Sequence, residues 1–316
     1  MVLMKLKLSS RDLALTAIFA ALSAIVVRVV PGIPIIGLSS ASIKFDAALA
    51  PIYGMIIGPY LGFLAGLVGG LVVASSLFSI LTSFATAISA FVAGSAVKDM
   101  LHIGNTTIKG WKIATAAIGL LILGWYATWV GQEAPFYPIL HLAGFFVLLL
   151  GRGRIAKAFE KGEGSDRNWR PDLYFMLIGV FILPLGFVFS SLSLNLVLFS
   201  VAYGISGVFM LAFYIIGGVA IVYGILGSRV KENYVMAVAL GSYCGIIADH
   251  MVGNLVFIQL IDAGVLKVPP EILPPLFMGV LPISAVERLL FTTIATVVGV
   301  GLISSIRRAG LYWKRE

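Results

Sequence analysis

The fold class of this chain is decided by a stretch near its amino terminus, residues 45–78, which reads FDAALAPIYGMIIGPYLGFLAGLVGGLVVASSLF. The stretch holds one charged side chain, Asp46, and two glycine-rich apolar runs that meet at Gly58 and Pro59. Proline is tolerated at the start of a helix but breaks the hydrogen-bond ladder inside one. The pattern therefore predicts two apolar helices, residues 45–58 and 60–78, joined by a tight turn.

The composition of the whole chain has the same character. Of its 316 residues, 60% are hydrophobic and 11% are charged, whereas soluble domains carry about 25% charged residues. A chain this apolar lacks the polar groups that would cover its surface in water, so we expect an all-α polytopic membrane protein. The single cysteine, Cys244, excludes a disulfide framework and any cysteine-based zinc or iron–sulfur site.

Ten stretches have the character of spanning helices, which need about 20 mostly apolar residues. They are residues 12–30, 45–58, 60–78, 82–98, 113–130, 135–150, 173–192, 205–227, 234–260 and 284–306. Ser9 and Asp12 predict a capping box at the start of the first span. Lys5 and Lys7 before an apolar run also resemble a signal peptide, but no clear cleavage site leads into a polar mature chain, so we expect this helix to be retained.

The basic residues test the span assignment independently, because cytoplasmic loops carry an excess of Lys and Arg. With ten spans and a cytoplasmic amino end, eighteen of the 22 basic residues fall in cytoplasmic segments. The other four are Arg28, Lys44, Lys267 and Arg288. We therefore expect a multi-pass protein of the cell membrane with both termini and the hydrophilic loop Gly151 to Asp172 in the cytoplasm. The net charge of +8 follows this pattern and does not indicate nucleic-acid binding.

Small residues recur at helical spacing on two of the expected spans. Gly62, Gly66 and Gly70 share one face of the third span. Faces of small residues let helix backbones approach closely in lipid, either inside one chain or between subunits. Internal packing is the simpler interpretation of both faces. The first span offers the candidates for docking to a separate membrane subunit, which are Ala17, Ala20, Ala21 and Ala24.

Polar and ionisable groups inside the apolar spans are few and share one depth, the outer half of the bilayer or its surface. A charge at mid-bilayer costs on the order of 3 kcal/mol, so each needs a partner, a hydrated cavity or a function. For any single residue, neutralisation by a neighbour is the simpler explanation, for instance Asp46 by Arg28. The set as a whole predicts an outward-facing pocket for a polar ligand. The substrate-binding candidates are Arg28, Lys44, Asp46, Asp249, His250, Asn254, Glu287 and Arg288.

The sequence lacks three motifs of common enzyme classes, namely a Gly-x-x-x-x-Gly-Lys-Ser/Thr loop, a His-Glu-x-x-His pair and a Gly-x-Ser-x-Gly motif. Its three histidines, His102, His141 and His250, fall at a cytoplasmic end, in the sixth span and in the outer half of the ninth. We therefore expect neither a shared metal site nor a cofactor, and no enzymatic activity. An intramembrane enzyme that uses Asp249, His250 and Glu287 stays an alternative.

Two parts of the chain resemble the substrate-binding S components of energy-coupling factor (ECF) transporters. The first spans residues 11–73 and contains an alanine-rich helix, Ile43-Lys44-Phe45-Asp46 and Gly58-Pro59-Tyr60-Leu61-Gly62. The second runs from Glu287-Arg288-Leu289-Leu290 to Arg307-Arg308. The resemblance implies six spans, an outward-facing pocket for a vitamin or related micronutrient, and docking onto a coupling membrane protein driven by two ATPases. It also implies that Ala17, Ala21 and Ala24 match the docking motif.

The length of the chain departs from that family. Residues 1–108 would form spans 1–4 of the S-component-like core and residues 231–316 its last two spans. Residues 109–230 would then be a four-span insertion that contains the basic loop 151–172. Three functions follow from these patterns, of which a solute-binding or transport subunit is favoured. The others are a non-catalytic accessory subunit of a larger membrane complex, supported by the small-residue faces, and the intramembrane enzyme.

Overall fold

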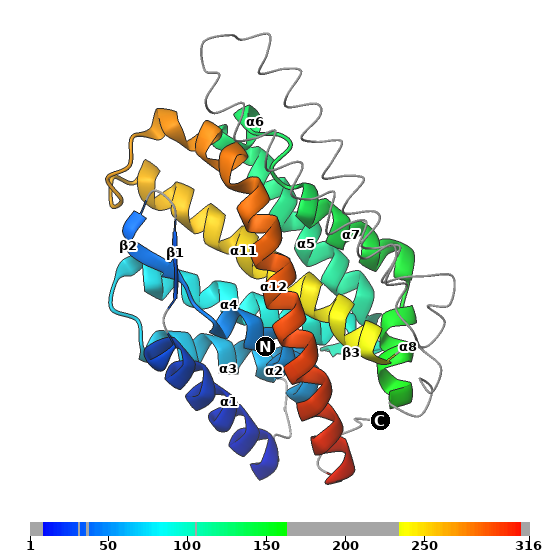
Figure 1. Ribbon diagram of the computed structural model, residues 1–316. Coiled ribbons are helices and arrows are strands. Elements are labelled where there is room, and N and C mark those ends of the chain that lie inside the picture. Colours follow the sequence, from blue (N-terminus) through cyan, green and yellow to red (C-terminus); the bar gives the residue numbers. More distant parts are fainter. Residues whose placement is uncertain (1–8, 31, 36–37, 105, 163–233, 311–316) are drawn as a thin grey trace.

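The computed structural model describes residues 9–30, 32–35, 38–104, 106–162 and 234–310. In these ranges the chain is helical apart from two short antiparallel hairpins (Figure 1). The hairpins pair β1 Ile33–Ile35 with β2 Leu38–Ile43, and β3 Met100–Ile103 with β4 Thr106–Lys109. The helices are α1 Ser10–Val29, α2 Asp46–Ile57, α3 Pro59–Val72, α4 Leu77–Ala96, α5 Gly110–Ala127, α6 Trp129–Glu133, α7 Ile139–Gly151, α8 Arg154–Lys161, α11 Tyr234–Asp262 and α12 Leu273–Arg308.

The lengths and hydropathy of these helices are those of an all-α polytopic membrane protein. Among the described residues, five helices are long and apolar enough to span a bilayer, namely α1, α4, α5, α11 and a segment that contains α12. The pair α7 and α8 passes the same test but bends by 76° at its break, while α2 and α3 are shorter apolar helices. The expected spans 173–192 and 205–227 lie outside the described residues, and each of the others has a helix in the structure.

Several expected boundaries were wrong by a turn or more. The last helix, α12, begins at Leu273, eleven residues before the expected start at residue 284, because it continues through Pro282. Conversely, α3 ends at Val72, and Ser76 caps α4 at Leu77, so the turn between them comes before residue 78. The two hairpins were not predicted from the sequence.

Two predicted helix ends are confirmed in detail. The backbone N–H of Asp12 donates to the Ser9 hydroxyl over 3.1 Å, and the backbone N–H of Ser9 donates to the Asp12 carboxylate over 3.2 Å, which is a capping box. Between α2 and α3, Gly58 has a φ of 88°, a left-handed conformation that favours glycine, and Pro59 is the first residue of α3. The tight turn sets the two short helices side by side.

Helices α2, α3 and α4 touch backbone to backbone. A methyl group built on Gly54 would lie 1.8 Å from the carbonyl oxygen of Ala90, and one on Gly62 would lie 2.6 Å from the Cα of Gly54. A methyl group on Gly66 would lie 3.1 Å from the backbone of Thr86 in α4. The glycine face of the third span therefore serves internal packing, in agreement with the simpler of the two interpretations.

Helix α11 lies at the centre of the helix packing, where it contacts α2, α4, α5, α7, α8 and α12 (Figure 1). Helix α12 also packs on α2, and α1 packs on α2 and α3. At the C-terminal end of α12, the guanidinium carbon of Arg307 lies 4.7 Å from the ring centre of Phe159 in α8 and 4.8 Å from that of Tyr234 in α11. This contact joins the ends of three helices that are distant in sequence.

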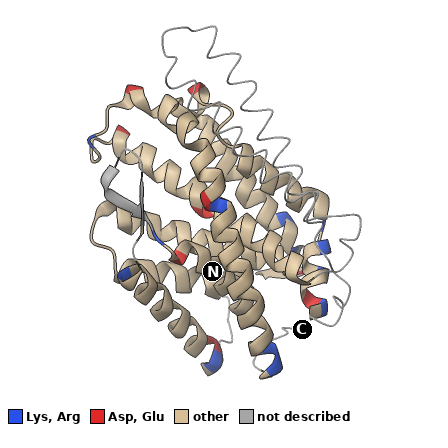
Figure 2. Ribbon diagram, viewed as in Figure 1, with Lys and Arg blue, Asp and Glu red and all other residues tan. Residues whose placement is uncertain are grey.

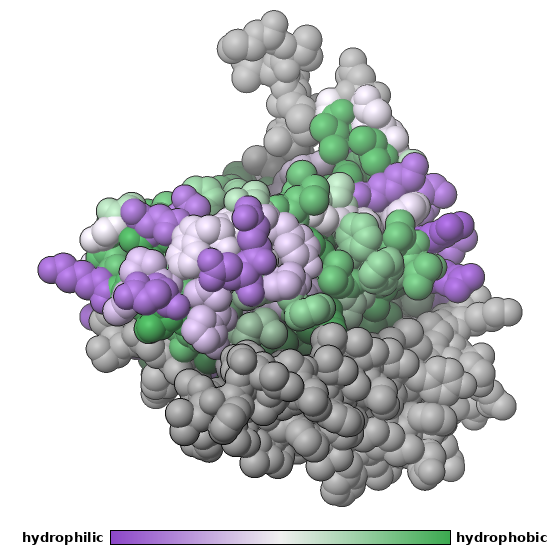
Figure 3. Space-filling model, turned by 90° about the horizontal axis from the view of Figure 1, so that it is seen from above, coloured by the Kyte–Doolittle hydropathy of each residue, from purple (hydrophilic) through white to green (hydrophobic). Residues whose placement is uncertain are grey.

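Charge and hydropathy are unevenly distributed along the molecule. Lys and Arg residues gather where α1 begins, where α12 ends and around α8 (Figure 2). Seen from the end at the top of Figure 1, hydrophilic residues gather on one part of the surface beside a hydrophobic area (Figure 3). The basic end is the one that the positive-inside pattern assigns to the cytoplasm, and this orientation stays a prediction.

Candidate functional site

A cavity of about 370 Å³ lies among α1, α2, α3, α4, α11 and α12. Its volume falls in the range of roughly 300–1,000 Å³ that is typical of small-molecule sites. The structure places all of the predicted substrate-binding residues on the wall of this cavity, although their contact with a ligand stays a prediction. They are Arg28, Lys44, Asp46, Asp249, His250, Asn254, Glu287 and Arg288.

The cavity runs from the surface into the interior of the helix bundle. Arg28, in the last turn of α1, is exposed, as are Ser75 and Ser76 before α4. By contrast, Asp46 is 5% exposed and Asp249 is 9% exposed. Because residues of both kinds line one cavity, a ligand that enters at the surface can reach buried charged groups.

Asp46 is held by hydroxyl groups from two other helices. Its Oδ2 accepts a hydrogen bond of 3.3 Å from the Ser23 hydroxyl in α1 and one of 3.4 Å from the Thr86 hydroxyl in α4. Among the described residues, no Lys or Arg nitrogen lies within 4 Å of Asp46 or Asp249. The structure therefore does not show the expected neutralisation of Asp46 by Arg28.

Glu287 and Arg288 form an ion pair on α12, with 2.8 Å between Oε2 and Nη2. The Arg288 side chain is 1% exposed and that of Glu287 is 14% exposed, so the pair lies at the boundary between the cavity and the protein interior. The Nε of Arg288 is buried and has no hydrogen-bond partner among the described residues. A buried guanidinium without a counter-charge would be costly, and Glu287 supplies that counter-charge.

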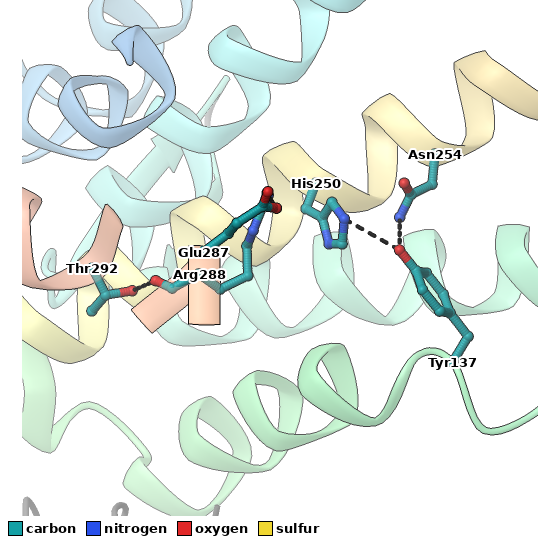
Figure 4. Close-up of polar contacts among 6 residues, drawn as sticks. All are labelled: Tyr137, His250, Asn254, Glu287, Arg288 and Thr292. Atoms are coloured by element: carbon teal, nitrogen blue, oxygen red, sulfur yellow. Dashed lines mark hydrogen bonds and ion pairs between the residues drawn. The ribbon is translucent and has the colours of Figure 1, made fainter. Parts of the chain in front are cut away.

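Tyr137, which precedes α7, joins two of the predicted residues on α11 (Figure 4). Its hydroxyl oxygen lies 3.1 Å from Nδ2 of Asn254 and 3.2 Å from Nε2 of His250. The Tyr137 ring stacks on Trp125 of α5, with ring centres 4.6 Å apart, and meets the edge of Phe277 of α12 at 4.9 Å. These contacts fix the ring at the cavity wall.

The cavity combines polar groups with aromatic surface. Beside the charged residues, the hydroxyl groups of Ser79, Thr82 and Ser83 line its α4 side. Its aromatic lining comes from α4, α11, α12 and the segment before α7, and consists of Phe78, Phe257, Phe277 and Tyr137. Such a site suits a ligand that has both a flat apolar ring and several hydrogen-bonding groups.

Two of the three histidines contact each other, which was not predicted from the sequence. His141 of α7 and His250 of α11 stack with ring centres 5.4 Å apart, whereas His102 lies in β3. This contact was not predictable, because His141 and His250 belong to spans that no sequence pattern identifies as neighbours. Within the described ranges, no group of three His, Cys, Asp or Glu residues is arranged to hold a metal ion.

The four alanines of α1 fall into two groups. Ala17 and Ala21 are exposed and Ala24 is half-buried, whereas Ala20 is buried. A methyl group on Gly69 of α3 would lie 2.7 Å from the carbonyl oxygen of Ala20, so Ala20 serves packing inside the chain. The assignment of Ala20 to the docking face is therefore corrected. The exposed face also carries large apolar side chains, namely Leu13, Ile18 and Ile25.

The fold is that of a polytopic membrane protein with a cavity of small-molecule size, and comparison with known proteins finds a family for the amino-terminal part of the chain. Residues 7–147 match the family model described as ECF-type riboflavin transporter, S component. This part of the chain is therefore S-component-like, and S components are transporter subunits that associate with ECF ATPases and a membrane T component. No curated protein and no solved structure matches the chain.

The family match extends past the expected domain boundary at residue 108. It includes all of α5 and most of α7, which the sequence analysis assigned to an insertion. In the structure, α5 packs on α4 and α11, and α7 packs on α5 and α11. The division into a core of residues 1–108 and 231–316 with an insertion at 109–230 stays a prediction.

Proposed function

We propose that the chain is the substrate-binding subunit of an ECF transporter and that its cavity takes up riboflavin or a closely related flavin. The observation that carries this proposal is the match of residues 7–147 to the riboflavin S-component model, which includes α1–α4 and the residues Arg28, Lys44 and Asp46. The match alone names a ligand class, and the cavity supplies chemistry that suits it.

Riboflavin has a flat three-ring system with nitrogen and carbonyl groups along one edge, and a flexible side chain with several hydroxyl groups. The aromatic residues Phe78, Phe257 and Phe277 offer surface against which a flat ring packs. The carboxylates and hydroxyl groups of the cavity wall offer partners for the hydroxyl groups of the ligand. These include Asp46, Asp249, Ser79 and Thr82.

The proposed direction of uptake follows from the position of the cavity along the bundle. Arg28, at the cavity, lies at the end of α1 opposite to Arg11, and Arg11 lies at the basic end of the molecule (Figure 2). If the basic end faces the cytoplasm, the cavity opens on the outer side. A substrate is then captured from outside the cell.

The proposed docking surface for the membrane T component is the exposed face of α1. Ala17 and Ala21 lie one helical turn apart on this face, which lets a partner helix approach its backbone. Exposed apolar side chains on the same helix, including Leu13 and Ile18, extend the surface. Transport would further require the ATPases that energise the complex.

A cavity-filling variant tests the proposed site. Gly253 of α11 lines the cavity, and a methyl group built on it meets no atom within 4 Å, so Gly253→Leu adds a side chain to open space. Gly301 of α12 also has open space around it but does not line the cavity, which makes Gly301→Leu the matched control. We expect riboflavin fluorescence to be quenched saturably by the purified wild-type chain and by Gly301→Leu, and not by Gly253→Leu.

Thermal denaturation in detergent should show that both variants remain folded. The proposal is wrong if the wild-type chain does not bind riboflavin and mass spectrometry of the purified chain finds a small molecule of another class. It is also wrong about the site if Gly253→Leu stays folded and binds riboflavin as tightly as Gly301→Leu does.

A further inference from the structure

Tyr137 occupies an unusual place in the cavity wall. It belongs to the short segment between α6 and α7, while the cavity residues that it contacts lie on α11 and α12, more than 110 positions later. Its side chain is 1% exposed and is clamped between Trp125 and Phe277. A rigid hydroxyl at this position controls the orientation of whichever side chains bond to it.

The donors and acceptors around the Tyr137 hydroxyl can be counted. The Asn254 amide nitrogen, at 3.1 Å, can only donate, so the Tyr137 oxygen accepts from it. The one hydrogen of the hydroxyl can then be donated to Nε2 of His250 at 3.2 Å in the tautomer that leaves this ring nitrogen unprotonated. In the structure the Asn254 nitrogen is turned toward Tyr137, and this orientation satisfies both bonds.

This orientation leaves the Asn254 carbonyl oxygen, Oδ1, turned away from Tyr137 (Figure 4). Asn254 is half-buried and lines the cavity, and its Oδ1 has no hydrogen bond to any described residue. The same oxygen is not among the buried polar atoms that lack a partner, so it remains accessible. An accessible carbonyl oxygen in a binding cavity is an acceptor for a ligand.

We infer that Tyr137 is a positioning residue for ligand recognition. Its hydroxyl fixes the carboxamide of Asn254 so that Oδ1 faces the cavity and accepts a hydrogen bond from an N–H group of the ligand. An amide that was free to rotate would present its NH₂ group equally well and would not distinguish a donor from an acceptor on the ligand. The inference rests on the proposed function, because it specifies how the same cavity selects its ligand.

The ligand class that this arrangement selects has a ring N–H next to carbonyl groups, as in a cyclic imide or lactam. Riboflavin carries one such N–H, at ring position N3. In 3-methylriboflavin a methyl group replaces that hydrogen, so the pair of compounds differs at the donor that Oδ1 would accept. A carbonyl oxygen left without its donor in a buried site costs binding free energy equivalent to roughly a tenfold change in Kd.

The test measures, for the wild-type chain and for each variant, the Kd of 3-methylriboflavin divided by the Kd of riboflavin. We expect the wild-type chain to bind riboflavin about tenfold more tightly than 3-methylriboflavin. Tyr137→Phe keeps the ring packing against Trp125 and Phe277 but removes the hydroxyl, and Asn254→Leu removes the carboxamide. In both variants the ratio should fall to below about threefold.

Tyr126→Phe is the matched control, since Tyr126 is exposed and its hydroxyl donates to the backbone oxygen of Pro135, away from the cavity lining. Its ratio should equal that of the wild-type chain. A purely structural role for Tyr137 would weaken both ligands equally and leave the ratio unchanged, which would overturn the inference. If the cavity excluded the methyl group of 3-methylriboflavin only by its size, the ratio would also stay unchanged in Tyr137→Phe, and the inference would be overturned.

A second measurement does not depend on flavin binding. A double-mutant cycle of Tyr137→Phe and Asn254→Leu on the thermal stability of the ligand-free chain measures their coupling directly. Non-additive effects are expected, and additive effects would overturn the role of Tyr137 in holding Asn254. If the wild-type chain binds neither flavin, the proposed function and the ligand part of the inference are wrong. The double-mutant cycle still shows in that case whether Tyr137 and Asn254 interact.

Discussion

Ser23 of α1 and Asp46 of α2 form a buried hydrogen bond of 3.3 Å from Oγ to Oδ2. Ser23 is fully buried, and the same carboxylate oxygen also accepts from Thr86 of α4. Three helices therefore meet at one carboxylate on the wall of the cavity. The contact replaces the ion pair that a buried carboxylate would otherwise need.

Replacement of Asp46 should separate its structural role from its charge. Asp46→Ala removes the acceptor for two hydroxyl groups, and we expect the free energy of unfolding to fall by about 1–3 kcal/mol. Asp46→Asn keeps an acceptor oxygen and should cost less. Thermal denaturation in detergent provides the measurement, with Thr293→Val as the control, because the Thr293 hydroxyl bonds only within its own helix at an exposed position. Equal effects of the alanine and asparagine variants would contradict this account.

The backbone contact between α2 and α4 predicts a large effect of a single methyl group. In Gly54→Ala, the new methyl group would lie 1.8 Å from the carbonyl oxygen of Ala90, so the helices must move apart. We expect a loss of about 3 kcal/mol or more in stability, at the upper end of overpacking effects. Gly301→Ala, at a helical position with open space, should be neutral or slightly stabilising. A Gly54→Ala chain as stable as Gly301→Ala would show that this contact is looser than described.

Ala20 and Ala21, which are adjacent in α1, should respond differently to replacement by leucine. Ala21 is exposed, so Ala21→Leu should leave the isolated chain folded but weaken its association with an ECF T component by keeping the two helices apart. Ala20 is buried against α3, so Ala20→Leu should lower the thermal stability of the isolated chain. Copurification and thermal denaturation measure the two effects. Loss of stability in Ala21→Leu would indicate internal packing instead of docking.

The predicted topology can be tested by cysteine labelling after Cys244, which is buried, has been replaced. Lys157 of α8 and Lys267 before α12 are both exposed and belong to opposite sides of the membrane in the ten-span topology. In intact cells, an impermeant thiol reagent should label a cysteine at position 267 and not one at position 157. Labelling at position 157 would reverse or invalidate the assignment.

The parts of the fold that were predictable are those that local chemistry determines. Ser9 and Asp12 cap α1, and Gly58 with Pro59 forms the turn before α3, because each feature depends on residues only a few positions apart. The extension of α12 to Leu273 was not predictable, because Pro282 within an apolar run is typical of a helix start and packing overrides it here.

The cavity residues were predictable to the extent that charge in an apolar span is itself a signal. Asp249, His250 and Glu287 stand out for this reason. Tyr137, Ser23 and Thr86 carry no such signal, since each is common in membrane helices and loops. Their roles depend on contacts across 113, 23 and 40 positions of sequence, respectively, which periodicity and composition do not encode.

The glycine contacts between α2, α3 and α4 also bear on how such a protein can evolve. Gly54 and Gly62 leave no volume for a side chain, so a mutation at either position disturbs several helices at once. Cavity positions such as Thr82 and Ile283 already carry side chains, and their replacement changes the surroundings of the ligand without moving a backbone. Selection for a different ligand can therefore change residues of the cavity wall while the glycine contacts between α2, α3 and α4 are kept.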